Sequence, residues 1–174
     1  MLLVAYIDPY FHFHGPMKGI SYRLGNQRYL NDGLARSFEY DAVIIGTSVT
    51  ENFRASEVEE LFGLKTIKKP FAGAAYKELS DNLKRYYTYN EDIKMVIWGM
   101  DMSSLDEPWD SSKYNEDEYP DYLYDNSWLN DVNYLLNKEV LLKGVLPDLL
   151  FTILGRESTT MDDYSWLEDT VGKE

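Results

Sequence analysis

The sequence predicts an α/β fold in which helices cover both faces of a parallel sheet. Residues 42–45 are an apolar, β-branched run without polar alternation, which is typical of a strand buried on both sides. Short apolar runs and helix-like segments then alternate up to residue 98, in the order strand, helix, strand, helix, strand. Because crossovers between parallel strands are right-handed, this order predicts a doubly wound unit.

Local signals set the expected boundaries of these elements. The first helix is expected to begin at a capping box, with Ser56 as N-cap and Glu59 at the third helical position, and to end at Gly63. The other expected elements are a strand over 64–69 that stops at Pro70, an amphipathic helix over 75–89, and a strand over 95–98.

The remaining segments have weaker patterns. Residues 10–38 contain four glycines and no sustained period, so a loop is expected there. Residues 139–154 have a helical period that Gly144 and Pro147 are expected to interrupt. Residues 1–7 are apolar and fit either a first strand or the outer end of a membrane anchor, although no run reaches the roughly 20 apolar residues that cross a bilayer.

These patterns divide the chain into four segments. Residues 1–38 are a lead-in, 39–105 the βαβαβ unit, 106–134 an acidic aromatic insertion, and 135–174 a helical segment. A parallel sheet of three strands is small and needs both faces covered. We therefore expect the domain to be incomplete at the C-terminus of the chain.

Charge excludes some functions. The formal net charge is -13, and residues 106–134 hold nine acidic residues and one basic residue. Nucleic-acid binding needs positive surface and is not expected. The insertion is interpreted first as a solvated segment, and alternatively as a sugar-stacking surface through six of its aromatic residues, Trp109, Tyr114, Tyr119, Tyr122, Tyr124 and Trp128. The chain has no cysteine, so disulfides, zinc thiolate sites and a cysteine nucleophile are excluded.

Three residues follow the carboxyl ends of the expected strands, where ligands bind in open α/β sheets. Ser48 is a candidate nucleophile, although Ser48 and Glu51 also match a capping box, so Ser48 is alternatively only a helix cap. Gly73 has a backbone N–H suited to an oxyanion, or is a plain turn glycine. Asp101 would bind a substrate hydroxyl, or cap the next segment.

A serine nucleophile needs a base, usually histidine. His12 and His14 are the histidines of the chain, and both precede Ser48. Their spacing is a weak metal signal, and their aromatic neighbours favour packing. We predict no metal site and no cofactor.

The stretch 44–48 resembles the first sequence block of the SGNH (GDSL-like) hydrolases, in which Gly-Asp-Ser ends the first strand. Four stretches are more closely similar to a group of bacterial, membrane-anchored SGNH-like proteins of unknown substrate, namely residues 8–14, 31–33, 46–53 and 70–78. The resemblance implies a flavodoxin-like three-layer sandwich of the SGNH-hydrolase type.

By this resemblance Ser48 matches the nucleophile and Gly73 the oxyanion glycine of the second block. Residues 99–101 fall where the family has Gly-x-Asn-Asp, but the stretch is one residue shorter and places Asp101 where a neutral asparagine would donate a hydrogen bond. The family's Asp-x-x-His block, which supplies the base, has no counterpart here. The chain is therefore interpreted as an N-terminal fragment that holds the nucleophile half.

The implied function is a serine esterase or O-acyltransferase that acts on acyl groups of cell-envelope carbohydrate, with this chain a partial and inactive piece. The implied location is the bacterial cell membrane, with a single N-terminal anchor and the domain outside the cytoplasm. The expected partner is a small-molecule or polysaccharide acyl substrate, without nucleic acid, and the oligomeric state is left open. The alternatives are a non-catalytic glycan-binding module and an intracellular α/β protein that binds a small anion.

Overall fold

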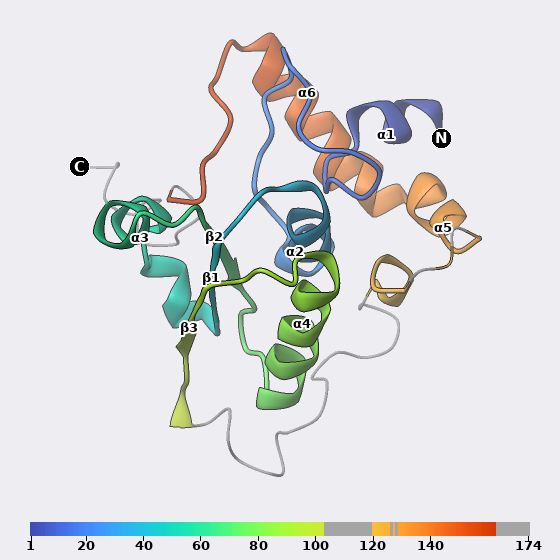
Figure 1. Cartoon of the computed structure of the whole chain (residues 1–174). Helices are drawn as coiled ribbons and strands as arrows, with labels where there is room; N and C mark the ends of the chain where they lie inside the picture. Colours follow the sequence, from blue (N-terminus) through green and yellow to red (C-terminus); the bar gives the residue numbers. More distant parts are fainter. Residues whose placement is uncertain (103–119, 126, 128, 163–174) are drawn as a thin grey trace. The chain divides into compact units, whose positions relative to one another are not determined.

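The computed structural model describes residues 1–102, 120–125, 127 and 129–162. The chain forms two compact units, one from residues 1–38 and 116–159 and the other from residues 39–115 and 160–174. Figure 1 names the helices and strands of both units.

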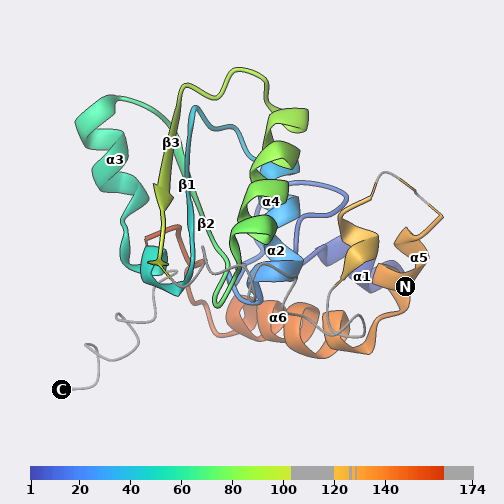
Figure 2. The ribbon, with the colours of Figure 1, turned by 90° about the horizontal axis from the view of Figure 1, so that it is seen from below.

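The second unit is an α/β unit with a three-stranded parallel sheet. Its strands are β1 (Ala42–Gly46), β2 (Thr66–Pro70) and β3 (Met95–Gly99), in the order β2-β1-β3. Helix α3 (Ala55–Phe62) joins β1 to β2, and α4 (Tyr76–Tyr89) joins β2 to β3. The two helices lie on opposite faces of the sheet (Figure 2), as expected because the crossovers from β1 to β2 and from β2 to β3 run in opposite directions across the sheet. The predicted α/β class is confirmed.

The central strand carries the core of this unit. Ala42, Val43, Ile44 and Ile45 are all at most 1% exposed, which is the burial expected of a strand covered on both faces. Lys68 and Lys69 of β2 are also fully buried. The Lys69 ammonium lies 4.1 Å from the ring centroid of Tyr86 and 5.7 Å from that of Tyr40, so two aromatic faces stabilise its charge.

The predicted start of α3 is wrong. The helix begins at Ala55 after Arg54 as N-cap, and no side chain caps it. The N–H of Ser56 donates instead to the carboxylate of Asp162 (3.1 Å), and the Glu59 carboxylate accepts from the N–H of Thr66 (2.9 Å). A distant carboxylate therefore replaces the local cap, and Glu59 fixes the start of β2. The predicted end at Gly63 is confirmed, because Gly63 adopts the left-handed conformation (φ 66°).

The first unit is helical in its described part, with elements from both ends of the chain. They are α1 (Leu2–Ile7), α2 (Gln27–Ser37), the 3-10 turn η4 (Asp121–Leu123), α5 (Asp131–Leu136), the π-helix η5 (Val140–Val145) and α6 (Leu146–Ile153). The α-helical pattern is interrupted at Gly144 by this π-helical segment, as expected, whereas Pro147 lies in the first turn of α6 and does not break the helix. A Cβ at Gly144 would lie 2.7 Å from the Pro9 ring, so glycine is needed there.

Two expectations for this unit are wrong. Residues 10–38 are not only loop, because α2 occupies part of them: Leu30 and Leu34 are fully buried, and Gly33 lets the helix approach the backbone of Tyr10 and Phe11. Residues 2–7 form a helix, not a strand, with Val4 and Ile7 buried. In the described part of the chain, no helix has the length and apolar character needed to span a membrane.

The aromatic insertion is described only in part. Trp109, Tyr114, Tyr119 and Trp128 lie outside the described residues. Tyr122 and Tyr124 are half-buried, and their hydroxyls are hydrogen-bonded to Asn137 (2.9 Å) and to the carbonyl of Arg28 (2.6 Å). The described part of the insertion around Tyr122 and Tyr124 therefore packs against its own unit, in contrast to the solvated segment that the sequence predicted.

A buried carboxylate connects α6 to the segment before α2. Asp148 is 1% exposed, and one of its oxygens accepts from the N–H of Arg23 (2.9 Å). Its other oxygen has no hydrogen-bond partner among the described residues. Burial raises the pKa of Asp148 from 3.8 to about 7, against the opposing effect of the Arg23 hydrogen bond and charge.

We expect Asp148→Asn to remove a pH dependence of stability. A raised folded-state pKa means that the folded protein holds a proton that the unfolded chain loses, so stability falls as pH rises from about 4 to about 7. The variant should therefore be more stable than the original protein at pH 8, and its advantage should be smaller at pH 5. We expect the advantage in the free energy of unfolding to differ between the two pH values by an amount on the order of 2 kcal/mol. Urea unfolding at both pH values measures it. Asp121→Asn, at an exposed carboxylate of the same unit, is the control, and equal pH profiles for all three proteins would contradict the expectation.

Candidate functional site

The candidate site lies at one edge of the sheet in the second unit. Gly46 pairs in register with Pro70 on one side and with Gly99 on the other, so the three parallel strands end level with one another. Ser48, Gly73 and Asp101 each follow a strand end by two or three residues. The structure thus brings the three segments that carry the candidate residues to the same edge.

Ser48 begins a short 3-10 helix, η1 (Ser48–Asn52), directly after β1. The residue is half-buried, and its neighbour Val49 is exposed. The N-cap of η1 is Thr47, and no side chain caps the turn. The interpretation of Ser48 as a helix cap paired with Glu51 is therefore wrong, and Ser48 lies inside the turn.

Two glycines allow η1 to fold closely over the strand ends. A Cβ at Gly46 would lie 2.7 Å from the Gly99 carbonyl oxygen and 2.8 Å from Cγ2 of Thr50, and a Cβ at Gly99 would lie 2.6 Å from the same methyl. Thr50 is 1% exposed and its hydroxyl donates to the carbonyl of Thr47. The position of Ser48 thus depends on the fit of one threonine against two residues without side chains.

Two further contacts hold the turn, and the sequence alone did not suggest either. The Thr47 hydroxyl donates to the carboxylate of Asp101, which connects the residue before Ser48 to the segment after β3. The buried Lys68 ammonium donates to the carbonyl of Glu51 (2.6 Å) at the other end of η1. The position of Thr47, directly after the glycine that ends β1, was the one sign in the sequence that its hydroxyl could lie at the strand edge. No sequence pattern indicates that Lys68 of β2 is buried.

Gly73 lies in the turn between β2 and α4. It has a positive φ of 69°, and no atom lies within 4 Å of the position where a Cβ would be. The turn is held by a bond from the Phe71 N–H to the carbonyl of Gly46 (2.9 Å) and by one from the Ala74 N–H to the carbonyl of Phe71 (3.0 Å). Gly73 is exposed, and its N–H donates to no acceptor among the described residues.

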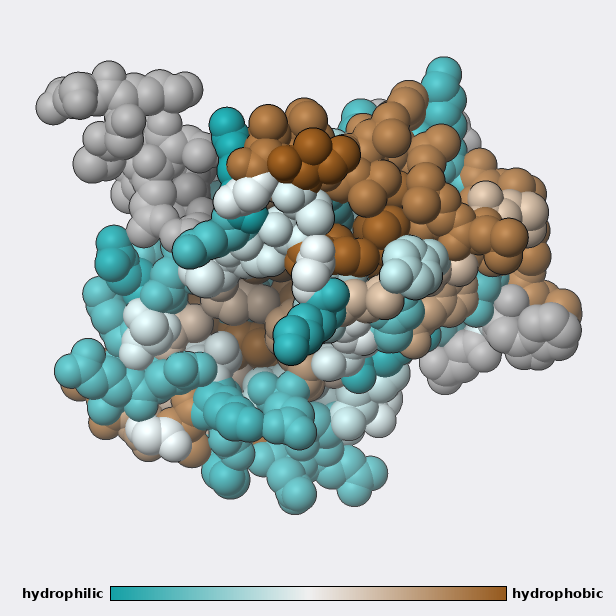
Figure 3. All heavy atoms as spheres, turned by 90° about the horizontal axis from the view of Figure 1, so that it is seen from above, coloured by the Kyte–Doolittle hydropathy of each residue, from teal (hydrophilic) through white to brown (hydrophobic). Residues whose placement is uncertain are grey.

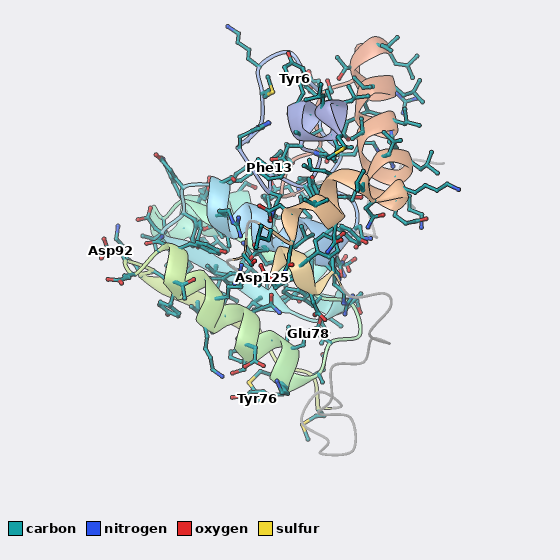
Figure 4. The ribbon with its side chains drawn as sticks, turned by 90° about the vertical axis from the view of Figure 1, so that its right-hand side faces the viewer. Tyr6, Phe13, Tyr76, Glu78, Asp92 and Asp125 are labelled. Atoms are coloured by element: carbon teal, nitrogen blue, oxygen red, sulfur yellow. The ribbon has the colours of Figure 1, made fainter. Side chains whose placement is uncertain are left out.

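An aromatic pair borders this edge. The rings of Tyr76, at the start of α4, and Trp98, near the end of β3, stack with centroids 5.3 Å apart and planes 10° apart. Tyr76 is 39% exposed and lies at the end of α4 opposite Asp92 (Figure 4). The indole N–H of Trp98 is buried without a hydrogen-bond partner in the described part of the chain. No motif or period in the sequence connects Tyr76 with Trp98, so their contact was not predicted.

The two histidines belong to the first unit and are held there by local contacts. The fully buried carboxylate of Asp8 accepts from the N–H groups of His12 (3.0 Å), Phe13 (2.7 Å) and His14 (2.8 Å), and from the Tyr134 hydroxyl (2.8 Å). The buried His12 ring contacts the Asp131 carboxylate through Nε2 (2.7 Å). This arrangement folds residues 8–14 around one carboxylate.

The His14 ring has a separate environment. Its nitrogens contact the carbonyl oxygens of Gly15 (2.7 Å) and Ala5 (3.3 Å). Desolvation lowers the pKa of His14, but these carbonyl contacts and the charge of Asp8 outweigh it, so the pKa lies above its ordinary value. The residues are in irregular backbone, not in a strand with both rings on one face. Within the described ranges, no group of three His, Asp or Glu side chains is arranged to hold a metal ion.

Comparison with known proteins adds no family to this geometry. No protein-family model, no curated protein and no solved structure matches the chain. The roles of Ser48, Gly73 and Asp101 therefore stay predictions that rest on the sequence and on the edge described above.

The fit of Thr50 against the glycines predicts a specific double-mutant result. Gly99→Ala should lower stability by about 2–3 kcal/mol, because the new methyl overlaps Cγ2 of Thr50. Thr50→Ser removes that methyl and keeps the hydroxyl, and the next contacts, at 3.7 and 3.8 Å, are ordinary. In urea unfolding, the Thr50→Ser/Gly99→Ala protein should therefore lose clearly less than the two single losses added together. Additive losses would mean that the overlap is not the cause.

Proposed function

We propose that the second unit is the nucleophile-bearing part of an SGNH-like serine esterase or O-acyltransferase. The finer description of the fold, a flavodoxin-like three-layer sandwich of the SGNH-hydrolase type, belongs to the same proposal. One observation carries it: a half-buried serine follows the central strand at the edge where Gly73 also lies, and the Gly73 N–H has no acceptor among the described residues. The resemblance of residues 46–53 and 70–78 to the SGNH-like group supports the same assignment.

The proposed chemistry is acyl transfer. The Ser48 hydroxyl oxygen bonds to the acyl carbon, and the carbonyl electron pair moves onto its oxygen. The N–H groups of Ser48 and Gly73 donate to this oxyanion. Its collapse releases the substrate alcohol and leaves an ester on Ser48, which water or a second hydroxyl then cleaves. The proton of Ser48 needs an acceptor, and the second unit contains no histidine. We therefore expect weak turnover or none from this chain.

The proposed substrate is an acyl group on cell-envelope carbohydrate. The exposed Tyr76 ring, stacked on Trp98 at the same edge, supports a sugar because aromatic faces are suited to flat, apolar sugar surfaces. Asp101 supports it as well, since a carboxylate accepts hydrogen bonds from sugar hydroxyls. We further propose a location outside the cytoplasm with a membrane anchor, which rests on the resemblance alone.

A fluorophosphonate probe tests the nucleophile. We expect a slow adduct on Ser48 in the purified chain, because no histidine of its unit takes the proton. It should still form about tenfold or more faster than on any other serine, because the neighbouring N–H groups favour the negative charge that develops on attack. Intact-mass and peptide mass spectrometry locate the adduct. Ser48→Ala should abolish it.

Ser56→Ala is the matched control, because Ser56 is an exposed serine of the same unit and should leave the adduct unchanged. Absence of an adduct on Ser48 would contradict the proposal. Hydrolysis of an aryl acetate at an ordinary enzymatic rate, lost in Ser48→Ala, would support the nucleophile but refute the expected inactivity of the chain.

A glycan-binding module without chemistry is the second candidate. The carboxylate of Asp101, which accepts from Thr47, favours it, because a negative charge at this edge opposes the formation of an oxyanion. On this view the edge holds a sugar through Tyr76 and Asp101, and Ser48 is a polar contact.

A change at Tyr76 should lower glycan binding on either view. Tyr76→Ala removes the exposed ring, and we expect it to weaken binding on an array of bacterial glycans about tenfold, whereas Tyr76→Phe keeps the ring and should bind nearly as well. Tyr87→Ala, at an equally exposed tyrosine of the same helix (40% against 39%), is the control. Glycan binding without a Ser48 adduct selects the module, and no glycan binding by the original protein would refute the sugar assignment.

A further inference from the structure

Exposed aliphatic side chains gather on helices of the first unit. Leu2 is 89% exposed and Ile153 80%, although both lie in helices. Figure 3 shows the resulting hydrophobic area as one broad region. We name it the Leu150 face, and its members are Leu2, Leu3 and Tyr6 of α1, Leu142 of η5, Leu146, Leu150 and Ile153 of α6, and Leu154.

The spacing of the residues in η5 and α6 places them on one side of these two helices. Leu142, Leu146, Leu150 and Ile153 recur every three or four residues, so they lie along one side of the rod formed by η5 and α6. Helix α1 packs against η5 through its other side, where Val4 and Ile7 are buried. A soluble monomer rarely exposes so large an apolar area without a use for it.

The rod carries few charges, unlike the chain, whose net charge is -13. Residues 140–153 contain one acid, Asp148, which is buried, and one exposed base, Lys143. Lys143 pairs with Glu139, which precedes the rod by one residue, and both side chains stay more than half exposed. The exposed residues Arg156 and Glu157 follow the rod, and the members of the Leu150 face include no acid.

Two guanidinium groups are fixed at the end of the face. The Cζ atoms of Arg23 and Arg156 lie 5.1 and 5.2 Å from the ring centroid of Phe151, and both residues are exposed. The backbone of this end is tied down, because the Ser21 hydroxyl donates to the carbonyl of Arg156 (2.6 Å) and the Ser21 N–H donates to the Thr152 hydroxyl (2.8 Å). The positive charge is thus held beside Ile153 and Leu154.

We propose that the Leu150 face lies on the surface of an anionic lipid bilayer. Leucine and isoleucine side chains enter the boundary between head groups and acyl chains, and the arginines bind lipid phosphates. This arrangement needs no membrane-spanning helix. The local positive charge of Arg23 and Arg156 at the end of the face favours lipid phosphates as the occupant, although the whole chain carries -13. The proposal does not depend on the chemistry of Ser48.

Vesicle flotation tests the proposal with the full chain. Binding is expected to vesicles of equal parts phosphatidylcholine and phosphatidylglycerol, and much less to phosphatidylcholine alone. Leu150→Glu/Ile153→Glu should reduce binding about tenfold or more, since it places two carboxylates in the apolar face. Arg23→Gln/Arg156→Gln should weaken binding to the anionic vesicles about fivefold for each arginine and reduce its salt dependence.

Leu61→Glu/Phe62→Glu is the matched control, because it adds the same charge at two residues of α3 that are 76% and 57% exposed in the other unit. It should bind as the original protein does, and circular dichroism checks that every variant is folded. Ile153→Ser is a milder variant if the double substitution fails to fold. Absence of binding to anionic vesicles, or an equal loss in the control, would overturn the proposal. Dimerisation in analytical ultracentrifugation that the same substitutions abolish would assign the face to a second copy instead.

Discussion

The close packing of Thr50 against Gly46 and Gly99 is the constraint on which the candidate site depends. The two glycines end paired strands, and the absence of their side chains leaves the space that Thr50 fills. This contact turns the chain sharply after β1 and places Ser48 in the turn. The bond from Thr47 to Asp101 and the bond from Lys68 to Glu51 then hold the two ends of η1. A larger residue at either glycine would displace the whole turn, so the chemistry of Ser48 is inseparable from the packing beneath it.

The first unit is organised by a different interaction, in which one buried carboxylate collects several donors. Asp8 accepts three backbone N–H groups and the Tyr134 hydroxyl, and thereby joins the turn after α1 to α5. A buried carboxylate with so many hydrogen bonds is well compensated, whereas the Asp148 carboxylate accepts a single bond from the described residues and has a raised pKa. The same residue type is therefore an anchor at one position and a titrating group at the other.

The two proposals rest on separate parts of the molecule. At the Ser48 edge a hydroxyl, the Gly73 N–H, a carboxylate and an aromatic pair follow the strand ends, and the proposed acylated sugar rests on this combination. The carboxylate opposes an oxyanion, and this is the strongest physical argument for a binding module over an esterase. The proposed lipid contact rests on the aliphatic members of the Leu150 face and on the arginines at its end, and it holds whichever function the Ser48 edge has.

The sequence by itself determined the parts of the fold that local physics controls. A buried β-branched run marked β1, Pro70 marked the end of β2, and Gly63 marked the end of α3. The order of elements implied parallel strands whose ends meet at one edge, where Ser48, Gly73 and Asp101 follow. Helix α2 was missed because Gly33 looks like a helix breaker in sequence, and only its packing against the backbone of Tyr10 and Phe11 explains it. The N-terminus of α3 was misplaced because its donor is satisfied by Asp162, more than a hundred positions away.

Only the tertiary structure decided which distant side chains contact one another. The contacts of Thr47 with Asp101, of Tyr76 with Trp98 and of His12 with Asp131 join residues whose separation along the chain carries no period or motif. Apolar residues recur every few positions in helices and strands because the backbone geometry is regular, and the sequence therefore indicates these elements. Contacts between distant side chains depend on how whole elements pack, and no short stretch of sequence contains that information.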